Sequence, residues 1–286
     1  MTIRYRGINA YMVGMRPQDI LMPVPAGLCC KPGGFHIDPV RPVERALITH
    51  GHSDHARAGH GAVLATRETL DMMRLRYGEN FAGSVQAVAY GEEIRLGDVT
   101  VAFHPAGHVL GSAQIAVTCK NTRIVASGDY KDARDPTCAP FELVPCDVFI
   151  TEATFGLPVF RHGDASGEVN KLLASVKLFP ERAHLVGAYS LGKAQRVIAL
   201  LREAGYDAPI YLHGDDAQWV TRPYPSIVPW QGDSHRISDD ILLVRGGGHF
   251  AGATMLHWRK GADGRGALLT GDIAMVAMDR RSVSFM

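Results

Sequence analysis

The sequence lacks a long apolar run, and it has almost no excess of charge of either sign. Its 286 residues contain no apolar stretch of about 18 residues, so we expect no transmembrane helix. Residues 1–15 carry Arg4 and Arg6 in place of an apolar segment with a cleavage site, so we expect no secretory signal. Thirty Lys and Arg against 29 Asp and Glu leave a net charge of +1. This balance excludes a strongly basic chain but is compatible with a local basic patch.

Cysteine is also scarce. The five cysteines are odd in number and fit no zinc-finger spacing, which predicts reduced, mostly buried thiols and a cytoplasmic location. A content of 46% hydrophobic and 21% charged residues is typical of a folded globular protein and excludes a disordered chain. The unusual count is 13 histidines, and histidine is the commonest metal ligand and a frequent acid–base group.

Short apolar runs bounded by turn residues predict a layered α/β protein. Two helices are expected, one over 66–77 with Thr66 as N-cap and Gly78 as its end, and one over 191–205 with an apolar stripe. The predicted strands are 46–49, 99–103, 114–118, 123–126, 148–150, 241–244, 254–258 and 267–269.

The strongest chemical signal is the string His-Gly-His-Ser-Asp-His at residues 50–55, directly after an apolar strand. His50 and His52 can both reach one cation from a loop at a strand end, and Asp54 and His55 can face a second cation beside it. Imidazole and carboxylate ligands suit Zn²⁺, with Mn²⁺ or Fe also compatible. The alternative is a solvated histidine-rich turn.

Such a site needs distant partners, and two polar residues at predicted strand ends can supply them. His108 follows Gly107, which allows a close approach of the backbone, and Asp129 follows the strand 123–126 and can bridge two metals. Two ions about 3.5–4 Å apart hold a hydroxide, lower its pKa and polarise an electrophile, which predicts a hydrolase. Residue types alone leave esters, amides and phosphodiesters open as substrates.

A glycine–histidine motif occurs twice. Residues 107–112 (Gly-His-x-x-Gly-Ser) precede a strand and Ser-Gly-Asp at 127–129, and residues 248–253 (Gly-His-x-x-Gly-Ala) precede a strand and Thr-Gly-Asp at 270–272. The recurrence predicts an internal repeat. The alternative is a chance likeness of two glycine-rich hairpins.

The order H-x-H-x-D-H, then Gly-His, then Ser-Gly-Asp resembles the metallo-β-lactamase superfamily. The resemblance implies an α/β fold, an αββα sandwich with a dinuclear site at one sheet edge. In that site one metal would be bound by His50, His52 and His108, the other by Asp54 and His55, with Asp129 bridging. Asp38, in Ile37-Asp38-Pro39, falls at the first acidic motif of the family and would orient the ligand histidines.

Two further motifs resemble the β-CASP nuclease branch of that superfamily. Residues 151–156 (Thr-Glu-Ala-Thr-Phe-Gly) resemble its acidic motif, and residues 189–195 (Tyr-Ser-Leu-Gly-Lys-Ala-Gln) resemble its S-x-G-[KR]-A-Q helix start. Residues 103–114 and 151–158 are especially similar to bacterial ligase-associated DNA exonucleases, within a resemblance that spans about 25–214. This implies a DNA exonuclease that acts with a DNA ligase in repair, with Asp54 and Glu152 as catalytic groups.

The residues of these motifs also have a chemical interpretation of their own. Ser190, Gly192 and Lys193 at a helix start can bind a phosphate of the substrate strand, through backbone N–H groups and a positive charge. The alternative is an amphipathic helix whose lysine is solvated. Glu152 can hold a ligand histidine or take a proton, and the alternative is a surface carboxylate.

The resemblance to the nuclease branch stops after about Gly214. No further Ser-Asp-His segment and no late Thr-His-Gly segment follow, and the tail resembles the middle of another metallo-β-lactamase-fold hydrolase. We therefore predict a core at 1–155, a truncated β-CASP-like segment at 156–214 and a second partial metallo-β-lactamase-like segment at 215–286. His249 or His257 would replace the missing late histidine ligand, or the tail only completes the sheet.

Three functions remain open from the sequence. The first is a DNA exonuclease with one or two Zn²⁺ ions, or with Mn²⁺. The second is a small-ester or lactone hydrolase of the same fold, and the third is an inactive recombined metal-binding protein. The expected partners are DNA and a DNA ligase, with no membrane; no expectation for the oligomeric state follows.

Overall fold

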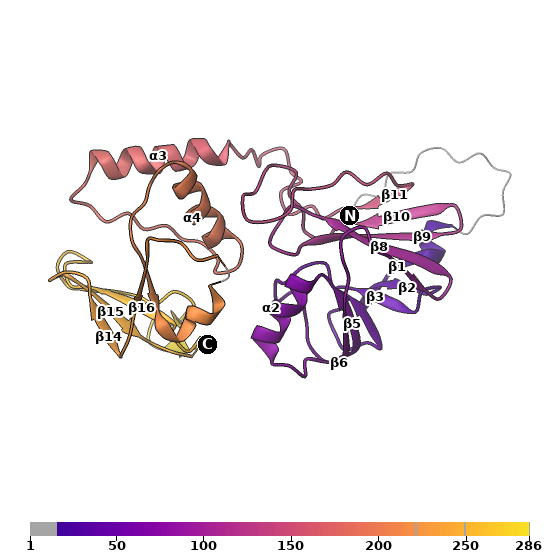
Figure 1. Ribbon diagram of the computed structural model, residues 1–286, viewed down its shortest axis with the longest axis horizontal. Coiled ribbons are helices and arrows are strands. Elements are labelled where there is room, and N and C mark those ends of the chain that lie inside the picture. Colours follow the sequence, from indigo (N-terminus) through magenta and orange to yellow (C-terminus); the bar gives the residue numbers. More distant parts are fainter. Residues whose placement is uncertain (1–15, 221, 249, 286) are drawn as a thin grey trace. The chain divides into compact units, whose positions relative to one another are not determined.

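The chain divides into two compact units, Met1–Gly205 and Tyr206–Met286. The computed structural model describes residues 16–220, 222–248 and 250–285 of them. The first unit contains two stacked sheets (Figure 1), and the predicted α/β sandwich is confirmed. Among the described residues, no helix combines the length and the apolar character that crossing a bilayer requires. The predicted boundaries near residues 155 and 214 stay a prediction.

The first sheet joins six strands in chain order, antiparallel from β1 to β3 and parallel from β3 to β6. It follows the short helix α1 (Pro17–Ile20) and consists of β1 (Leu21–Val24), β2 (Gly27–Cys30), β3 (Phe35–Ile37), β4 (Arg45–Leu47), β5 (His60–Ala65) and β6 (Ala82–Ala87). The second sheet has the order β11-β10-β9-β8-β7, antiparallel except between β10 and β11. Its strands are β7 (Glu93–Leu96), β8 (Val99–Pro105), β9 (Ala113–Cys119), β10 (Thr122–Ala126) and β11 (Val148–Ile150).

The main core lies between the two sheets. Phe35 and Leu47 of the first sheet and Phe103 and Ile115 of the second are fully buried in one cluster, as alternation along a half-buried strand requires. The helix α2 (Arg67–Tyr77) covers the outer face of the first sheet with Leu70 and Met73. This packing fixes where β4, β8 and β10 end, and the predicted metal ligands follow those ends.

The helices α3 (Ala165–Leu178) and α4 (Lys193–Glu203) complete the first unit. Polar contacts connect α4 to the segment that follows Asp129. Arg196 Nη1 donates to Oδ2 of the buried Asp135 at 3.2 Å, and Arg134 donates to both carboxylate oxygens of Glu203 at 3.1 and 2.8 Å. The helix α4 is thereby held against the segment that follows Asp129.

The second unit repeats part of the first in the same order of elements. It opens with β12 (Ile210–His213), the 3₁₀ helix η1 (Gly214–Trp219) and β13 (Ile227–Trp230), and β12 and β13 are parallel like β5 and β6. An antiparallel sheet follows, with β14 (Ser234–Arg236), β15 (Ile241–Arg245), β16 (Thr254–Trp258) and β17 (Ala267–Leu269), in the order of β7 to β10. The strands β18 (Ala274–Val276) and β19 (Val283–Phe285) form a separate hairpin.

Two of the three glycine pairs in the two motifs adopt matching conformations, whereas Gly111 has a positive φ and Gly252 does not. Gly107 and Gly248 have φ values of 72° and 80°, and Gly128 and Gly271 have 56° and 55°. This left-handed backbone favours glycine, so the repeat seen in the sequence has a conformational basis. The likeness therefore extends from a short motif to seven consecutive elements.

Two predicted elements were too long. The strand expected over 46–49 ends at Leu47, because the backbone N–H of Thr49 donates to Asp38 Oδ1 at 2.8 Å and leaves the sheet. The helix expected over 191–205 begins only at Lys193, because Gly192 has a φ of 90° and cannot continue a right-handed helix, and it ends at Glu203.

Candidate metal centre

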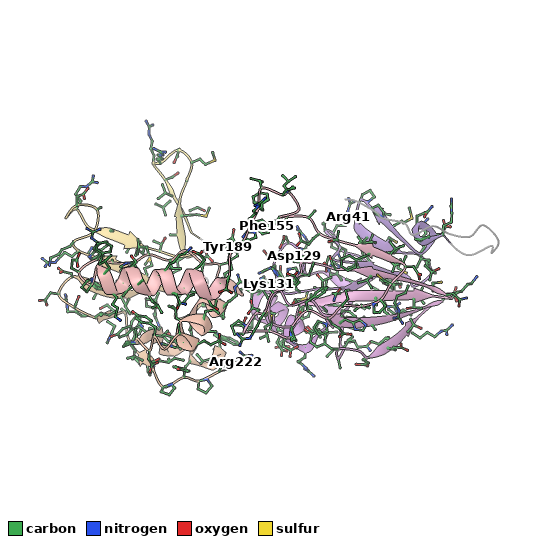
Figure 2. The ribbon with its side chains drawn as sticks, turned by 90° about the horizontal axis from the view of Figure 1, so that it is seen from above. Arg41, Asp129, Lys131, Phe155, Tyr189 and Arg222 are labelled. Carbon is green, nitrogen blue, oxygen red and sulfur yellow. The ribbon has the colours of Figure 1, made fainter. Side chains whose placement is uncertain are left out.

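Four of the predicted ligands meet at one edge of the sandwich. One ligand atom from each of four residues lies within 4.8 Å of the other three, and these residues are His50, His52, His108 and Asp129. The loops after β4, β8 and β10 supply them. We call this group the metal cluster. Figure 2 labels Asp129, so the cluster can be located on the ribbon.

The hydrogen bonds at its rim determine which ring nitrogen of His50 and of His52 carries a proton. The carbonyl of Leu191 can only accept, so His52 Nε2–H donates to it at 3.3 Å and Nδ1 keeps a lone pair. Thr49 Oγ1 donates to Asp38 Oδ2 at 2.6 Å and therefore accepts from His50 Nδ1–H at 3.1 Å. The lone pair of His50 is left on Nε2, which faces the cluster.

The inner nitrogens of the cluster lie very close together. His52 Nδ1 is 2.9 Å from His50 Nε2 and 3.2 Å from His108 Nε2. Two lone pairs at the first of these separations repel each other unless a cation is shared between them. Asp129 Oδ2 adds a carboxylate 3.8 Å from His50 Nε2 and 3.7 Å from His108 Nε2. Three imidazoles and one carboxylate with this arrangement fit a divalent metal ion.

A second group adjoins the cluster at His55. His55 Nδ1–H donates to Asp38 Oδ2 at 2.8 Å, which directs Nε2 toward Asp129 Oδ1 at 3.5 Å and Asp54 Oδ2 at 3.7 Å. Asp129 thus faces the cluster with one oxygen and His55 with the other. His55 Nε2 therefore lies within 4 Å of both Asp54 and Asp129, the two carboxylates that were predicted to share a second ion with it.

Asp38 holds both groups in position from behind. One of its oxygens accepts hydrogen bonds from Thr49 and His55, and its backbone has a φ of 43°, in the left-handed region. Such a conformation is uncommon outside glycine, although aspartate tolerates it better than most residues. A carboxylate behind a ligand histidine fixes the ring orientation and its proton.

The charge states of two cluster histidines also suit metal binding. Burial, followed by the nearby histidines, lowers the pKa of His50 well below its usual value and that of His108 to about 4. These imidazoles are neutral near pH 7 and have lone pairs for a metal. Burial lowers the pKa of His55, but the hydrogen bond and charge of Asp38 outweigh it and raise that pKa to about 9. Burial raises the pKa of Asp129.

The predicted phosphate-binding segment lies against the cluster. Leu191 accepts the bond from His52, and a Cβ on Gly192 would come within 2.5 Å of Val109 Cγ1, next to His108. Two backbone N–H groups of the expected anion cradle are already bonded. Gly192 N donates to Gln195 Oε1 at 2.8 Å, and Ala194 N donates to Tyr189 O at 3.0 Å. Among Ser190, Gly192 and Lys193, the ammonium of Lys193 is the group best suited to an anion.

Glu152 lies near the site, and its hydrogen bonds go to residues other than the cluster histidines. Its N–H donates to Ser127 Oγ at 3.2 Å, its Oε2 accepts from Thr154 N at 2.6 Å, and its charge contributes to the raised pKa of Asp129. The structure therefore places Glu152 within electrostatic reach of the cluster.

Of the two tail histidines that were predicted as substitute ligands, the structure describes one. His249 lies outside the described residues. His257 lies within β16 and lines a pocket of about 250 Å³ in the second unit, together with Arg236, Asp239, Asp240, Ile241, Leu242 and Arg259. Whether either histidine supplies a ligand stays a prediction.

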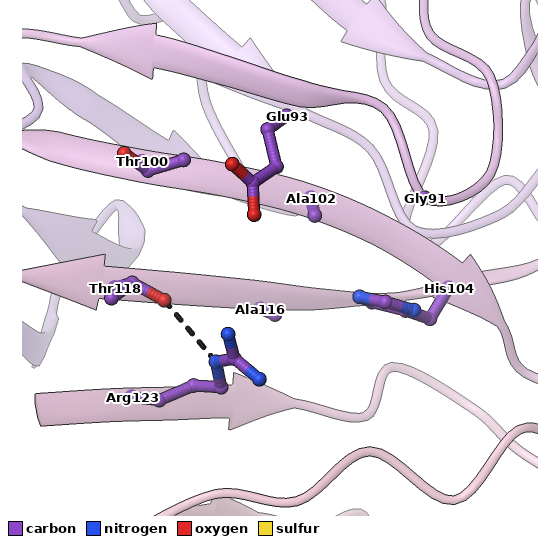
Figure 3. A pocket seen from close by; sticks show the side chains of 8 residues that line it. All are labelled: Gly91, Glu93, Thr100, Ala102, His104, Ala116, Thr118 and Arg123. Carbon is purple, nitrogen blue, oxygen red and sulfur yellow. Dashed lines mark hydrogen bonds between the residues drawn. The ribbon is translucent and has the colours of Figure 1, made fainter.

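A second pocket, of about 80 Å³, lies on the outer face of the second sheet (Figure 3). Thr100, Ala102 and His104 line it and alternate along β8 with Val101 and Phe103, which face the core. It contains none of the predicted site residues, so it is separate from the metal cluster.

Sequence reasoning missed the supporting contacts of the site. The carbonyl of Leu191 and the hydroxyl of Thr49 set the protons of two histidines, and Arg196 with Asp135 anchors the helix beside them. A backbone carbonyl leaves no trace in a sequence. Thr49, directly before His50, was the one signal available.

Comparisons with known proteins agree with this geometry. A probable DNA ligase of Opitutus terrae is 28% identical over 67% of this chain and 19% of its own length. A ribonuclease of Thermus thermophilus is 30% identical over 68% of this chain and 51% of its own. YmaE, an uncharacterized protein of Bacillus subtilis, is 53% identical over 28% of this chain and 30% of its own length. The chain thus spans about half or less of each of these relatives. The profile of the Metallo-beta-lactamase superfamily matches residues 36–187, more than half of the chain, and the chain belongs to that superfamily.

Proposed function

We propose that this chain is a metal-dependent phosphodiester hydrolase, a DNA exonuclease that works with a DNA ligase. The observation that carries the proposal is the convergence of His50, His52, His108 and Asp129 within 4.8 Å, with the segment of Lys193 packed beside them. A metal cluster alone suits many hydrolases. A metal cluster whose adjoining segment carries a lysine favours a substrate that contains phosphate.

The cluster residues would hold the first ion, and Asp54, His55 and Asp129 would hold the second. Zn²⁺ is the ion that this set of imidazoles and carboxylates favours, and Mn²⁺ is also compatible. When bound, such ions supply an activated water and polarise a phosphoryl oxygen. Asp38 fixes the ring orientation of His55 directly and that of His50 through Thr49.

The remaining residues act on the substrate strand. Lys193 attracts a phosphate next to the one being cleaved, and Glu152, beside Asp129, can accept a proton during the reaction. We propose DNA as the substrate, in place of RNA, because of the resemblance to ligase-associated exonucleases and because one relative is named a probable DNA ligase. The relative named a ribonuclease makes RNA the competing substrate.

The test is cleavage of labelled DNA and RNA strands by the metal-loaded protein. We expect degradation of DNA from an end, loss of activity with a chelator, and at least a hundredfold loss in Asp54→Ala. The control is Asp71→Ala, which removes a surface aspartate that pairs with its helical neighbour Arg74. Preferred cleavage of RNA would reassign the substrate. Hydrolysis of nitrophenyl esters or lactones in place of phosphodiesters would favour the ester hydrolase.

The metal content tests the role of the tail. We expect about two ions per chain with both groups filled, measured by elemental analysis after dialysis. A content that falls in His257→Ala or His249→Ala would show that the tail supplies a ligand. A content near one, unchanged by both substitutions, would rule out that role and leave the second ion weakly bound.

A further inference from the structure

Two exposed aromatic side chains lie close in sequence to residues that adjoin the metal cluster. Tyr189 is 69% exposed and stands two residues before Leu191, whose carbonyl binds His52. Phe155 is 56% exposed and stands three residues after Glu152, whose charge acts on Asp129. Both residues are labelled in Figure 2, as is Asp129. Neither aromatic ring has a role in holding a metal.

The ring of Tyr189 is combined with a positive charge. Lys193 Nζ lies 4.6 Å from the centre of the ring, which is a cation–π contact. Gly192, between the two residues, is packed against Val109, so this pair is held beside the cluster instead of lying on a free loop. A flat ring and an ammonium group together can bind a nucleotide, the ring through its base and the ammonium through its phosphate.

Phe155 belongs to a small aromatic group. The ring centres of Phe160 and His162 lie 5.4 and 4.8 Å from that of Phe155, both in edge-on arrangements. Phe160 is 45% exposed, and Arg161 between the two partners is exposed as well. Isolated exposed apolar residues are ordinary. Three rings that support one another beside a cationic residue make a surface suited to stacking.

We infer that Tyr189 and the Phe155 group bind unstacked bases, so that this protein selects single-stranded nucleic acid. The inference rests on the proposed function, because it supplies the strand on which the metal cluster would act. In a duplex the faces of the bases are covered by their neighbours, whereas a single strand can present them to aromatic side chains. Stacking depends little on base identity, so the selection is for strand form and not for sequence.

The test compares two strands with the same backbone charge. One is a labelled oligothymidylate of about 12 nucleotides, and the other is a strand of equal length built from abasic units. Binding is measured by fluorescence anisotropy with a chelator present, so that neither strand is cleaved. We expect the unmodified protein to bind the thymidylate at least about tenfold more tightly than the abasic strand.

The variants locate that preference. Tyr189→Ala and Phe155→Ala should each reduce the preference for bases by about fivefold, whereas Tyr189→Phe keeps a ring and should retain it. The control is Leu143→Ala, which removes an apolar side chain that is 83% exposed in the same unit. Equal affinities for the two strands, or a preference that survives both alanine variants, would overturn the inference.

The outcome can be separated from that of the proposed function. The binding assay requires no turnover, so a protein that cleaves no phosphodiester but loses its base preference in Tyr189→Ala keeps the inference and refutes the activity. A protein that cleaves DNA but shows no preference for bases in binding keeps the proposed activity and refutes the inference. Uridylate and abasic RNA strands distinguish RNA from DNA, and base dependence on either strand supports the inference.

Discussion

The histidines of the metal cluster depend on one carboxylate that binds no ion in our assignment. Asp38 accepts hydrogen bonds from Thr49 and His55, and through Thr49 it also sets the proton of His50. The cluster itself was predictable from the sequence, because two of its residues lie in one short string and the other two follow strand ends. The hydrogen bonds from His50 to Thr49 and from Thr49 to Asp38 were not predictable, because they depend on where Thr49 leaves the sheet.

Replacing Asp38 by asparagine should lower metal affinity about 10- to 100-fold with little change in fold, because the amide cannot accept at both sites with the charge of a carboxylate. Competition with a chromophoric chelator measures the affinity. Asp71→Asn, at a surface ion pair, should leave it unchanged. An unchanged affinity in Asp38→Asn would contradict the assigned role.

The metal-free protein should be most stable near pH 6.5. The raised pKa of His55, about 9, stabilises the fold below its unfolded value of about 6.5 and is lost as the pH rises toward 9. The lowered pKa values of His50 and His108 act in the opposite direction and destabilise the fold as the pH falls below about 6.5.

Urea denaturation with a chelator at several pH values measures this profile. In Asp38→Asn the alkaline decline should flatten, because the group that raises the pKa of His55 is gone. A decline that keeps its full slope in this variant would assign it to other residues.

Elements with strong local signals were predicted well, and elements that depend on distant contacts were not. The helix α2 runs from Arg67 to Tyr77 between the expected caps Thr66 and Gly78. By contrast, β6 is almost wholly exposed and shows no alternation, so only its backbone pairing with β5 defines it. The helix α3 was missed altogether.

The start of α4 gives a test of local geometry. Gly192 and Gly205 both have positive φ, 90° and 79°, but a Cβ on Gly192 would collide with Val109 and one on Gly205 would meet no atom within 4 Å. Both alanine variants should lose about 1 kcal/mol of unfolding free energy from backbone strain.

Only Gly192→Ala should also lose cleavage activity, by tenfold or more, because the collision moves Lys193 and Leu191 away from the cluster. Steady-state kinetics on a DNA strand and a thermal melt measure the two effects. Equal losses of activity in both variants would show that strain, and not position, is responsible.

The two units should respond differently to metal. All residues of the metal cluster belong to Met1–Gly205, so we expect two thermal transitions, of which metal raises one. The rise should be about 5–10 °C at a free metal concentration 100 times the dissociation constant. Calorimetry with and without chelator measures it. A shift of both transitions would show that the tail takes part in binding.

The repeated elements of the second unit have a consequence for how a new activity can arise. The second unit reproduces β5 to β10 of the first with matching glycines, while its described residues contain no counterpart of β4 and the histidine loop that follows it. The second unit thus keeps the framework of the first without the loop that carries the metal ligands. Selection can add a new chemistry to it without first having to invent an architecture.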